Sequence, residues 1–179
     1  MSCCAVVIDS DGVAHVGYES GLSEQGLFFD MPPKMRKIKT GEHVLVCGTA
    51  RACEKFLSEL EKANGDPLAI PKDDWFMGQG VDPNSDSDEW EGAAIIIKDG
   101  AAHFIEGPSV MIPIKSPGYY AIGSGAWFAL AVLWHMLSGK TNVTEKLALK
   151  ALNCALEASC ALAKESCSPP IIIETLEVA

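Results

Sequence analysis

The most informative stretch of the chain is residues 122–139, with the sequence IGSGAWFALAVLWHMLSG. A glycine-containing turn over residues 123–125 leads into the segment 126–138, in which nearly every position is apolar. A helix on the surface of a globular protein has one polar face, whereas a helix that is apolar all round is typically buried on several sides. Gly139 then ends the helix. The sequence therefore predicts a core helix over residues 126–138.

A second long helix is predicted directly after the first. Asn142 and Glu145 have the three-residue spacing of a capping box at its start, and the proline pair 169–170 ends it. Its apolar stripe contains Leu149, Leu152, Leu156, Cys160 and Ala163. Nearer the N-terminus, the segment 50–63 has helical spacing and ends at the Asn-Gly pair 64–65.

Short apolar runs that occur in pairs predict antiparallel strands. The expected pairs are 3–9 with 13–18, 34–39 with 43–47, and 93–98 with 101–105, and a final strand covers 171–173. A turn containing glycine joins the two members of each pair, as in a β-hairpin. The segments 19–33 and 66–91 contain Gly and Pro and are predicted to be irregular, the second as an insertion. Hairpins followed by grouped helices predict a layered α+β structure, and the length favours a single domain over residues 1–179.

The composition and charge exclude several classes of protein. A net charge of −10 and a pI near 4.8 argue against a nucleic-acid-binding surface, which needs clustered Lys and Arg. The longest apolar run, 126–134, is about half the length that spans a bilayer, and the N-terminus has no signal-peptide core. The seven cysteines include no Cys-x-x-Cys pair, and an odd number leaves one unpaired. We therefore expect a soluble, reduced, cytoplasmic protein without membrane contact.

Several side chains suggest a function that their sequence surroundings do not support. Ser124 lacks the Gly-x-Ser-x-Gly pattern of a serine-hydrolase nucleophile, so it is interpreted as the N-cap of the helix that follows. The alternating acidic residues at 82–88 lack the glycine and the final Glu of a calcium loop. Trp127, Phe128 and Trp134 are expected to pack against the neighbouring helix. These residues predict no metal site and no organic cofactor.

The order and spacing of several short stretches resemble the proteasome β-subunit and its bacterial relative, the HslV-type peptidase. The stretches are 2–7 at the N-terminus, 11–20 over the first hairpin, 34–38 with 44–50, the Ile-Gly-Ser-Gly motif at 122–125, and 165–168 before the last strand. The Ile-Gly-Ser-Gly motif is the most specific of these. The resemblance implies a four-layer αββα sandwich, in which two antiparallel sheets lie between layers of helices.

The resemblance also implies a set of catalytic residues. In that family the N-terminal residue of the chain is the nucleophile and its freed α-amine is the base, which is workable because an α-amine titrates near pH 8. Ser2 would be the nucleophile after removal of Met1, and the backbone N–H of Gly48 would bind the oxyanion. Lys34 would keep the pKa values of the amine and the hydroxyl low, with Glu19 as its charge partner. The residues expected to support the amine are Ser124, Glu165 and Ser168.

The sequence departs from the family pattern at three of these positions. The family nucleophile is Thr, whereas this chain has Ser2 followed by Cys3. Shifting the alignment by one residue makes Cys3 the nucleophile, which requires an additional cleavage after Ser2. Glu19 and Glu165 stand where the family has Asp, and the longer side chain changes their reach.

The function implied by the resemblance is hydrolysis of peptide bonds inside a self-assembled ring. The substrate would be unfolded polypeptide, the assembly a homo-oligomer, and an ATP-dependent unfoldase a possible partner. Two other functions remain open from the sequence. One is a catalytically inactive ring or scaffold subunit, and the other is an N-terminal-nucleophile amidase that acts on a small amide.

Overall fold

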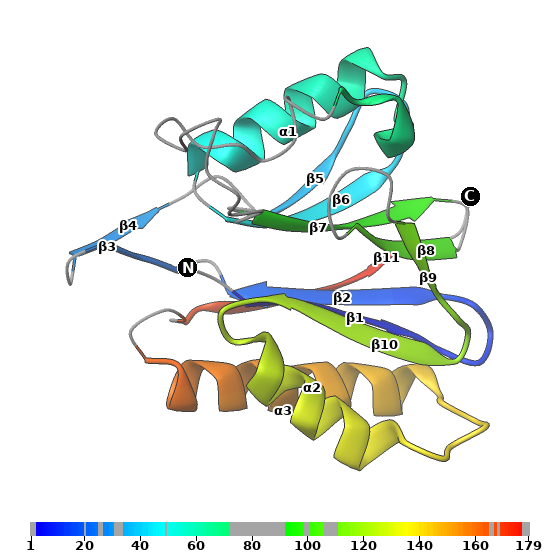
Figure 1. Cartoon of the computed structure of the whole chain (residues 1–179). Helices are drawn as coiled ribbons and strands as arrows, with labels where there is room; N and C mark the ends of the chain where they lie inside the picture. The colour runs from blue at the N-terminus through cyan, green and yellow to red at the C-terminus, as the bar shows by residue number, and fades with distance from the viewer. Residues whose placement is uncertain are drawn as a thin grey trace, which may run out of the picture.

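The computed structural model describes residues 3–19, 21–24, 27–30, 34–48, 50–71, 92–98, 101–105, 111–164, 167 and 169–176, with the backbone alone for 21–24, 27–30 and 51. Figure 1 shows four layers. Helices α2 (Ala126–Leu137) and α3 (Glu145–Leu162) cover one sheet, a second sheet lies against the first, and α1 (Ala50–Lys62) covers the outer face of the second sheet. The predicted α+β sandwich with two antiparallel sheets between layers of helices is confirmed.

The sheet beside α2 and α3 has four antiparallel strands. Their spatial order is β10 (Gly118–Gly123), β1 (Cys3–Ile8), β2 (Ala14–Glu19) and β11 (Ile171–Leu176). Cys3 pairs with Gly123, and Glu19 pairs with Ile171. The first residue of β1 and the last residue of β2 therefore lie at the same end of this sheet.

The second sheet has five antiparallel strands. Their order is β5 (Met35–Lys37), β6 (His43–Gly48), β7 (Gly92–Lys98), β8 (Ala101–Ile105) and β9 (Met111–Ile114). A separate pair contains β3 (Gly21–Glu24) and β4 (Leu27–Asp30), so the prediction that 19–33 is irregular is wrong over these two strands. Strands β9 and β10 were not predicted, because Pro113 and Gly118 interrupt the pattern that marks a strand.

Three apolar cores fill the spaces between the four layers. All six residues of β1 are buried, because one face of the strand meets the helices and the other meets the second sheet. Side chains of a strand alternate between the two faces. Cys3, Ala5 and Val7 accordingly join the core under α2 and α3, whereas Cys4, Val6 and Ile8 join the core between the sheets. A third core lies between the second sheet and α1.

The ends of the helices agree with the sequence predictions in part. Helix α1 ends at Asn64 and Gly65, whose φ angles of 54° and 79° are the left-handed geometry of a helix C-terminus. The N-cap of α2 is Gly125 and has no side-chain hydrogen bond, so the interpretation of Ser124 as the cap is wrong. A Cβ atom on Gly125 would lie 2.7 Å from Sγ of Cys167. Only a glycine permits this close approach of α2 to its neighbours.

The start of α3 differs from the prediction. Its N-cap is Thr144, whose Oγ1 accepts a hydrogen bond from the backbone N–H of Leu147 at 3.4 Å. The prediction that Asn142 caps this helix is wrong, because Val143 lies outside the helix. The N–H of Val143 donates to Oγ of Ser10 at 2.7 Å, which ties this segment to the turn between β1 and β2.

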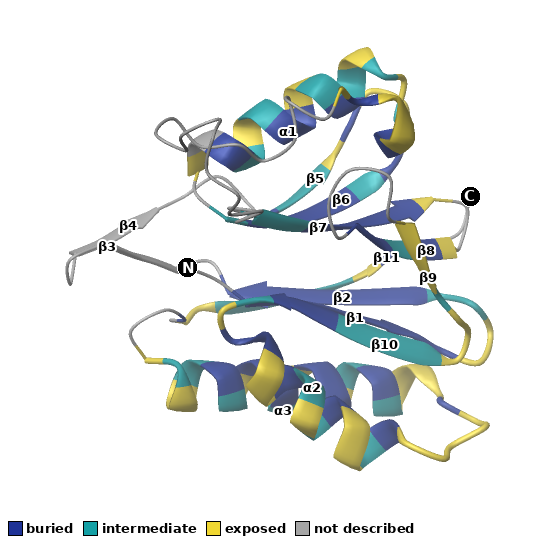
Figure 2. Cartoon of the chain, viewed as in Figure 1, coloured by how far each residue is buried: buried dark blue, intermediate teal, exposed yellow. Residues whose placement is uncertain are grey.

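Helix α2 exposes side chains that were expected to be buried. Ala129, Leu133 and Leu137 are buried, but Trp127 is 81% exposed, Trp134 is 63% exposed and Phe128 is 37% exposed. Figure 2 shows the exposed outer face of α2. The expectation that these tryptophans pack against the neighbouring helix is therefore wrong within one chain. In the part of the chain that the structure describes, no helix is long and apolar enough to cross a membrane.

Candidate active site

Four of the residues predicted for catalysis lie at or next to strand ends on one side of the sandwich. Glu19 is the last residue of β2, Lys34 immediately precedes β5, and Gly48 is the last residue of β6. Ser124 follows β10, whose last residue pairs with Cys3. The structure thus brings four of the seven predicted residues to one end. Ser2, Glu165 and Ser168 lie outside the described residues.

A buried ion pair joins the two sheets at this end. Nζ of Lys34 contacts Oε1 of Glu19, and the exposed fractions of the two side chains are 9% and 0%. The backbone of Lys34 is held by β6, because the N–H of Val46 donates to its carbonyl oxygen at 2.9 Å. An exposed pair of this kind contributes little to stability, whereas removing one partner of a buried pair leaves a costly uncompensated charge.

Glu19 also binds the N-terminal strand. The backbone N–H of Cys3 donates to Oε1 of Glu19 at 3.0 Å. The second oxygen, Oε2, is buried and has no hydrogen-bond partner among the residues that the structure describes. Buried carboxylate oxygens are almost always hydrogen-bonded, so an unsatisfied one marks a position where a further donor fits. Oε2 of Glu19 therefore lacks a hydrogen-bond donor in the described part of the chain.

The thiol of Cys3 lies away from the ion pair, in the core under α2 and α3. The residue is completely buried. Burial raises the pKa of this thiol to about 12, although a hydrogen bond with Ser159 lowers it in part. A thiol with this pKa is protonated at physiological pH, and the thiolate is the reactive form. Cys3 is therefore a structural thiol as long as Ser2 has not been cleaved from the chain.

The predicted oxyanion donor Gly48 and the glycine that precedes Ser124 have unusual backbone geometry. Gly48 has a φ angle of 155° and Gly123 has a φ angle of 95°, which residues with a side chain rarely adopt. Gly48 is half-buried and pairs with Gly92 on the neighbouring strand.

Ser124 contacts the segment that contains two of the undescribed site residues. It is exposed, and its side chain hydrogen-bonds Cys167, which lies between Glu165 and Ser168 in the sequence. Burial raises the pKa of the Cys167 thiol to about 11, and the hydrogen bond from Ser124 lowers it in part. Ser124 therefore contacts Cys167, and its predicted role in supporting the amine stays a prediction.

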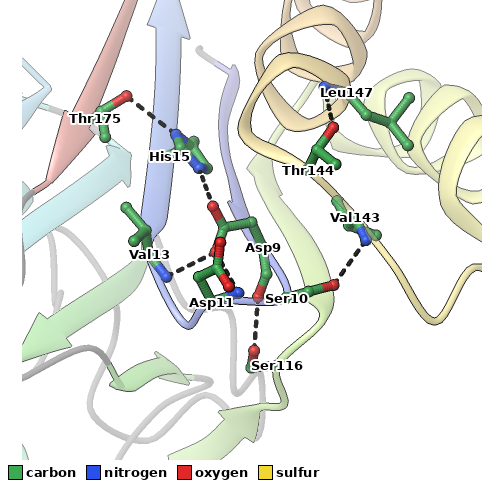
Figure 3. A network of polar contacts seen from close by, with 10 residues as sticks. All are labelled: Asp9, Ser10, Asp11, Val13, His15, Ser116, Val143, Thr144, Leu147 and Thr175. Atoms are coloured by element: carbon green, nitrogen blue, oxygen red, sulfur yellow. Dashed lines mark hydrogen bonds and ion pairs between the residues drawn. The ribbon is translucent and has the colours of Figure 1, made fainter.

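A second buried carboxylate, Asp9, was not singled out from the sequence and lies at the opposite end of β1 and β2 (Figure 3). Oδ1 of Asp9 accepts hydrogen bonds from the N–H groups of Asp11 and Val13, both at 2.9 Å. Oδ2 of Asp9 lies 2.9 Å from Nε2 of His15, and Nδ1 of His15 lies 3.0 Å from Oγ1 of Thr175. An Asp that begins a turn and binds the N–H two residues on is a known local pattern, and it could have identified Asp9. Among the described residues no cluster of His, Cys, Asp and Glu could hold a metal ion.

Comparisons of the sequence with protein-family models and with curated proteins find no match. Comparison with solved structures finds HslV from Trypanosoma brucei, with a TM-score of 0.73 and 17% identity over 98% of this chain and 99% of that chain. BPH from Thiobacillus denitrificans has a TM-score of 0.71 and 14% identity over 99% and 98% of the two chains. The same BPH in complex with epoxomicin has a TM-score of 0.69 and 15% identity over 99% of each chain. The chain has the proteasome-type fold of HslV.

The resemblance that the sequence motifs indicated is confirmed at the level of the HslV fold. The matches extend over nearly the whole length of both chains, so no large part of the sandwich is missing or added. At identities of 14–17% the likeness establishes the fold, and the chemistry must be argued from the residues of this chain.

Proposed function

We propose that this chain is a peptidase that uses Ser2 as an N-terminal nucleophile. The observation that carries the proposal is the buried Lys34–Glu19 ion pair, whose carboxylate binds the N–H of Cys3 and retains an unpartnered oxygen. Ser2 is the residue bonded to that N–H. Removal of Met1 would create an α-ammonium group on Ser2, next to the residue whose N–H binds Glu19. Oε2 of Glu19 could then accept a hydrogen bond from this ammonium group.

The proposed reaction starts with the amine of Ser2 in its neutral form. The amine takes the proton of the Ser2 hydroxyl, and Oγ attacks the carbonyl carbon of the scissile peptide bond. The ammonium of Lys34 favours the deprotonated hydroxyl, and the N–H of Gly48 binds the oxyanion. The amine returns the proton to the leaving amino group, which leaves an ester on Ser2. Water then hydrolyses the ester with the same amine as base, and this restores the enzyme.

The environment of Cys3 supports Ser2 as the nucleophile. The Cys3 thiol is buried under the helices, and its pKa is raised to about 12. Use of Cys3 would need both cleavage after Ser2 and reorientation of this side chain. Ser2 needs only the removal of Met1, which a small second residue permits.

The proposal includes the setting in which the peptidase works. We expect it to assemble into a homo-oligomeric ring that encloses the active sites, and to act on unfolded polypeptide in the cytoplasm. The exposed tryptophans of α2 supply an apolar surface for contacts between subunits. An ATP-dependent unfoldase is a possible partner, because a closed ring needs its substrates unfolded.

Hydrolysis of fluorogenic peptides by the purified chain tests this function. We expect turnover that is lost in Ser2→Ala, a substitution that still allows removal of Met1, and retained in the exposed control Ser138→Ala. Cys3→Ala retains turnover if Ser2 is the nucleophile. Epoxomicin, which is bound in the BPH structure, should inhibit the wild type. A chain that cleaves no peptide in a broad panel but assembles into rings would instead be an inactive ring subunit.

A further inference from the structure

Two buried thiols from opposite sheets are in contact between the layers. Cys4 lies on β1 and Cys47 lies on β6, and their Sγ atoms are 3.3 Å apart. Cys4 is 0% exposed and Cys47 is 3% exposed, and both belong to the core between the sheets. The S–H of Cys47 is placed to donate to Sγ of Cys4 or to the carbonyl oxygen of Ile122 at 3.6 Å. Both residues are free thiols in the structure.

The two sulfur atoms are already in contact across the core. A disulfide needs a sulfur–sulfur distance of about 2.05 Å, so the two Sγ atoms must approach by only ~1.3 Å. Burial raises the pKa of the Cys4 thiol well above its ordinary value, so Cys4 is protonated and is placed to react second, with an oxidised form of Cys47.

We propose that Cys4 and Cys47 are an oxidation site that forms a disulfide between the two sheets. A small peroxide supplies the oxidising equivalents. Cys47, the more exposed thiol, attacks one peroxide oxygen, becoming a sulfenic acid and releasing one water. The Cys4 sulfur then attacks the sulfenic sulfur, the S–S bond forms, and the hydroxyl leaves with the thiol proton as a second water. One hydrogen peroxide and two thiols thus give one disulfide and two waters.

The position of the pair gives the disulfide a consequence for the site described above. Cys4 follows Ser2 by two residues, and Cys47 immediately precedes Gly48. Cross-linking these strands fixes the proposed nucleophile strand relative to the proposed oxyanion donor. This part of the inference rests on the proposed function. A shift of about 1 Å in such an arrangement can lower a rate by about 100-fold, so we expect at least about a 10-fold loss of turnover on oxidation.

Alkylation of the native chain after treatment with hydrogen peroxide tests the site without using activity. The protein is treated under native conditions, the peroxide is removed, and all remaining thiols are alkylated in denaturant. We expect a monomer with two fewer alkylated cysteines out of seven. Trypsin should release a cross-link between the peptides 1–34 and 40–51, which contain Cys4 and Cys47, and dithiothreitol should separate them.

Variants on the same strand assign the cross-link to one residue. Peptide 1–34 also contains Cys3, which faces the helices. Cys4→Ser and Cys47→Ser should abolish the cross-link, and Cys3→Ser should retain it. Seven alkylated cysteines, a cross-link that persists in Cys4→Ser, or only disulfides between chains would each overturn the proposal. A wild-type protein that forms the cross-link but cleaves no peptide would refute the proposed function and leave the oxidation site established.

Discussion

The two ends of the β1–β2 hairpin each bury a carboxylate, and the two carboxylates are bound in different ways. At the turn end, Asp9 is 3% exposed, and both of its oxygens have partners in the backbone and in His15. At the open end, Glu19 is 0% exposed, and Oε1 binds Lys34 and the N–H of Cys3 while Oε2 has no partner in the described chain.

This difference separates a structural network from a candidate catalytic one. The Asp9 carboxylate, whose oxygens all have partners, stabilises the turn between β1 and β2. The neighbouring Ser10 hydrogen-bonds Val143 and so connects this turn to the segment before α3. A buried carboxylate with one free oxygen is stable only because Lys34 neutralises its charge, and it can bind one additional donor. We therefore expect substitutions at the open end to affect activity and substitutions at the turn end to affect stability.

Loss of the Lys34 charge should have the largest effect. Lys34→Ala removes the counter-charge of the buried Glu19 carboxylate and the proposed stabiliser of the Ser2 oxygen. We expect turnover of a fluorogenic peptide to fall by about 100-fold or more and the free energy of unfolding to fall by about 3 kcal/mol. Peptide hydrolysis and urea denaturation measure the two effects.

The control for this variant is another lysine in an ion pair. Lys39 lies 3.2 Å from Glu61, but its side chain is 84% exposed. Lys39→Ala should change the free energy of unfolding by about 0.5 kcal/mol or less and leave turnover unchanged. Equal effects of the two substitutions would show that the burial of the Lys34 pair has no special importance.

Loss of the Asp9 carboxylate should lower stability alone. Asp9→Ala leaves two backbone N–H groups and His15 without their acceptor, and we expect the free energy of unfolding to fall by about 2–3 kcal/mol. The turnover of the folded fraction should stay within about twofold of the wild type, because the site lies at the other end of the strands. The control Asp11→Ala removes an exposed carboxylate and should change stability by about 0.5 kcal/mol or less. A large loss of turnover in fully folded Asp9→Ala protein would contradict the view that the Asp9 end of the hairpin affects stability alone.

The layered α+β class, the first hairpin and the buried helices could be predicted from the sequence, because they depend on local periodicity, whereas the order of the four layers came from the family resemblance. Strand β1 appears as a short apolar run, and the Asn64-Gly65 stop of α1 is a backbone requirement that is visible in the residue types. The helix over 126–137 was likewise found from its composition. Its exposed face was not found, because an all-apolar helix does not show which side lacks a neighbour in the same chain.

The contacts of the site depended on long-range packing and could be predicted only through the family resemblance. The pairing of Lys34 with Glu19 was predicted in this way, but its burial was not, since 15 residues separate the two in sequence. The free oxygen of Glu19, the Cys4–Cys47 contact and the Thr144 cap each depend on where a distant strand or turn lies. No local pattern contains that information.

Acid should weaken the turn end in a predictable pH range. Burial raises the pKa of Asp9, but the hydrogen bonds with His15, Val13 and Asp11 outweigh burial and hold this pKa below its ordinary value. A carboxylate whose pKa is lower in the folded chain than in the unfolded chain stabilises the fold at any pH above the unfolded value of about 3.9. This stabilisation is lost as the pH falls through the folded pKa. The difference in unfolding free energy between the wild type and Asp9→Asn should therefore be constant above about pH 5 and shrink below about pH 4. Urea midpoints of the two proteins measured across this range test the prediction. A difference in unfolding free energy that stays unchanged in acid would mean that the charge of Asp9 does not contribute to stability.

The exposed face of α2 should show the smallest effect on the single chain. Trp127→Ala should change the free energy of unfolding by about 0.5 kcal/mol or less, whereas Leu133→Ala, in the core of the same helix, should lower it by about 3 kcal/mol. Light scattering of the folded Trp127→Ala protein tests whether this face joins subunits. A smaller assembly at unchanged stability is expected, and an unchanged assembly would place the subunit contacts elsewhere.

The N-terminus itself is the place to examine whether the open end is catalytic. The intact mass of the purified protein is measured before and after treatment with a serine- and cysteine-reactive electrophile, and the adduct is mapped by fragmentation. We predict a chain that has lost Met1 and carries one adduct on Ser2. A chain that retains Met1 and carries no N-terminal adduct would contradict the catalytic assignment and leave a proteasome-type fold used for assembly.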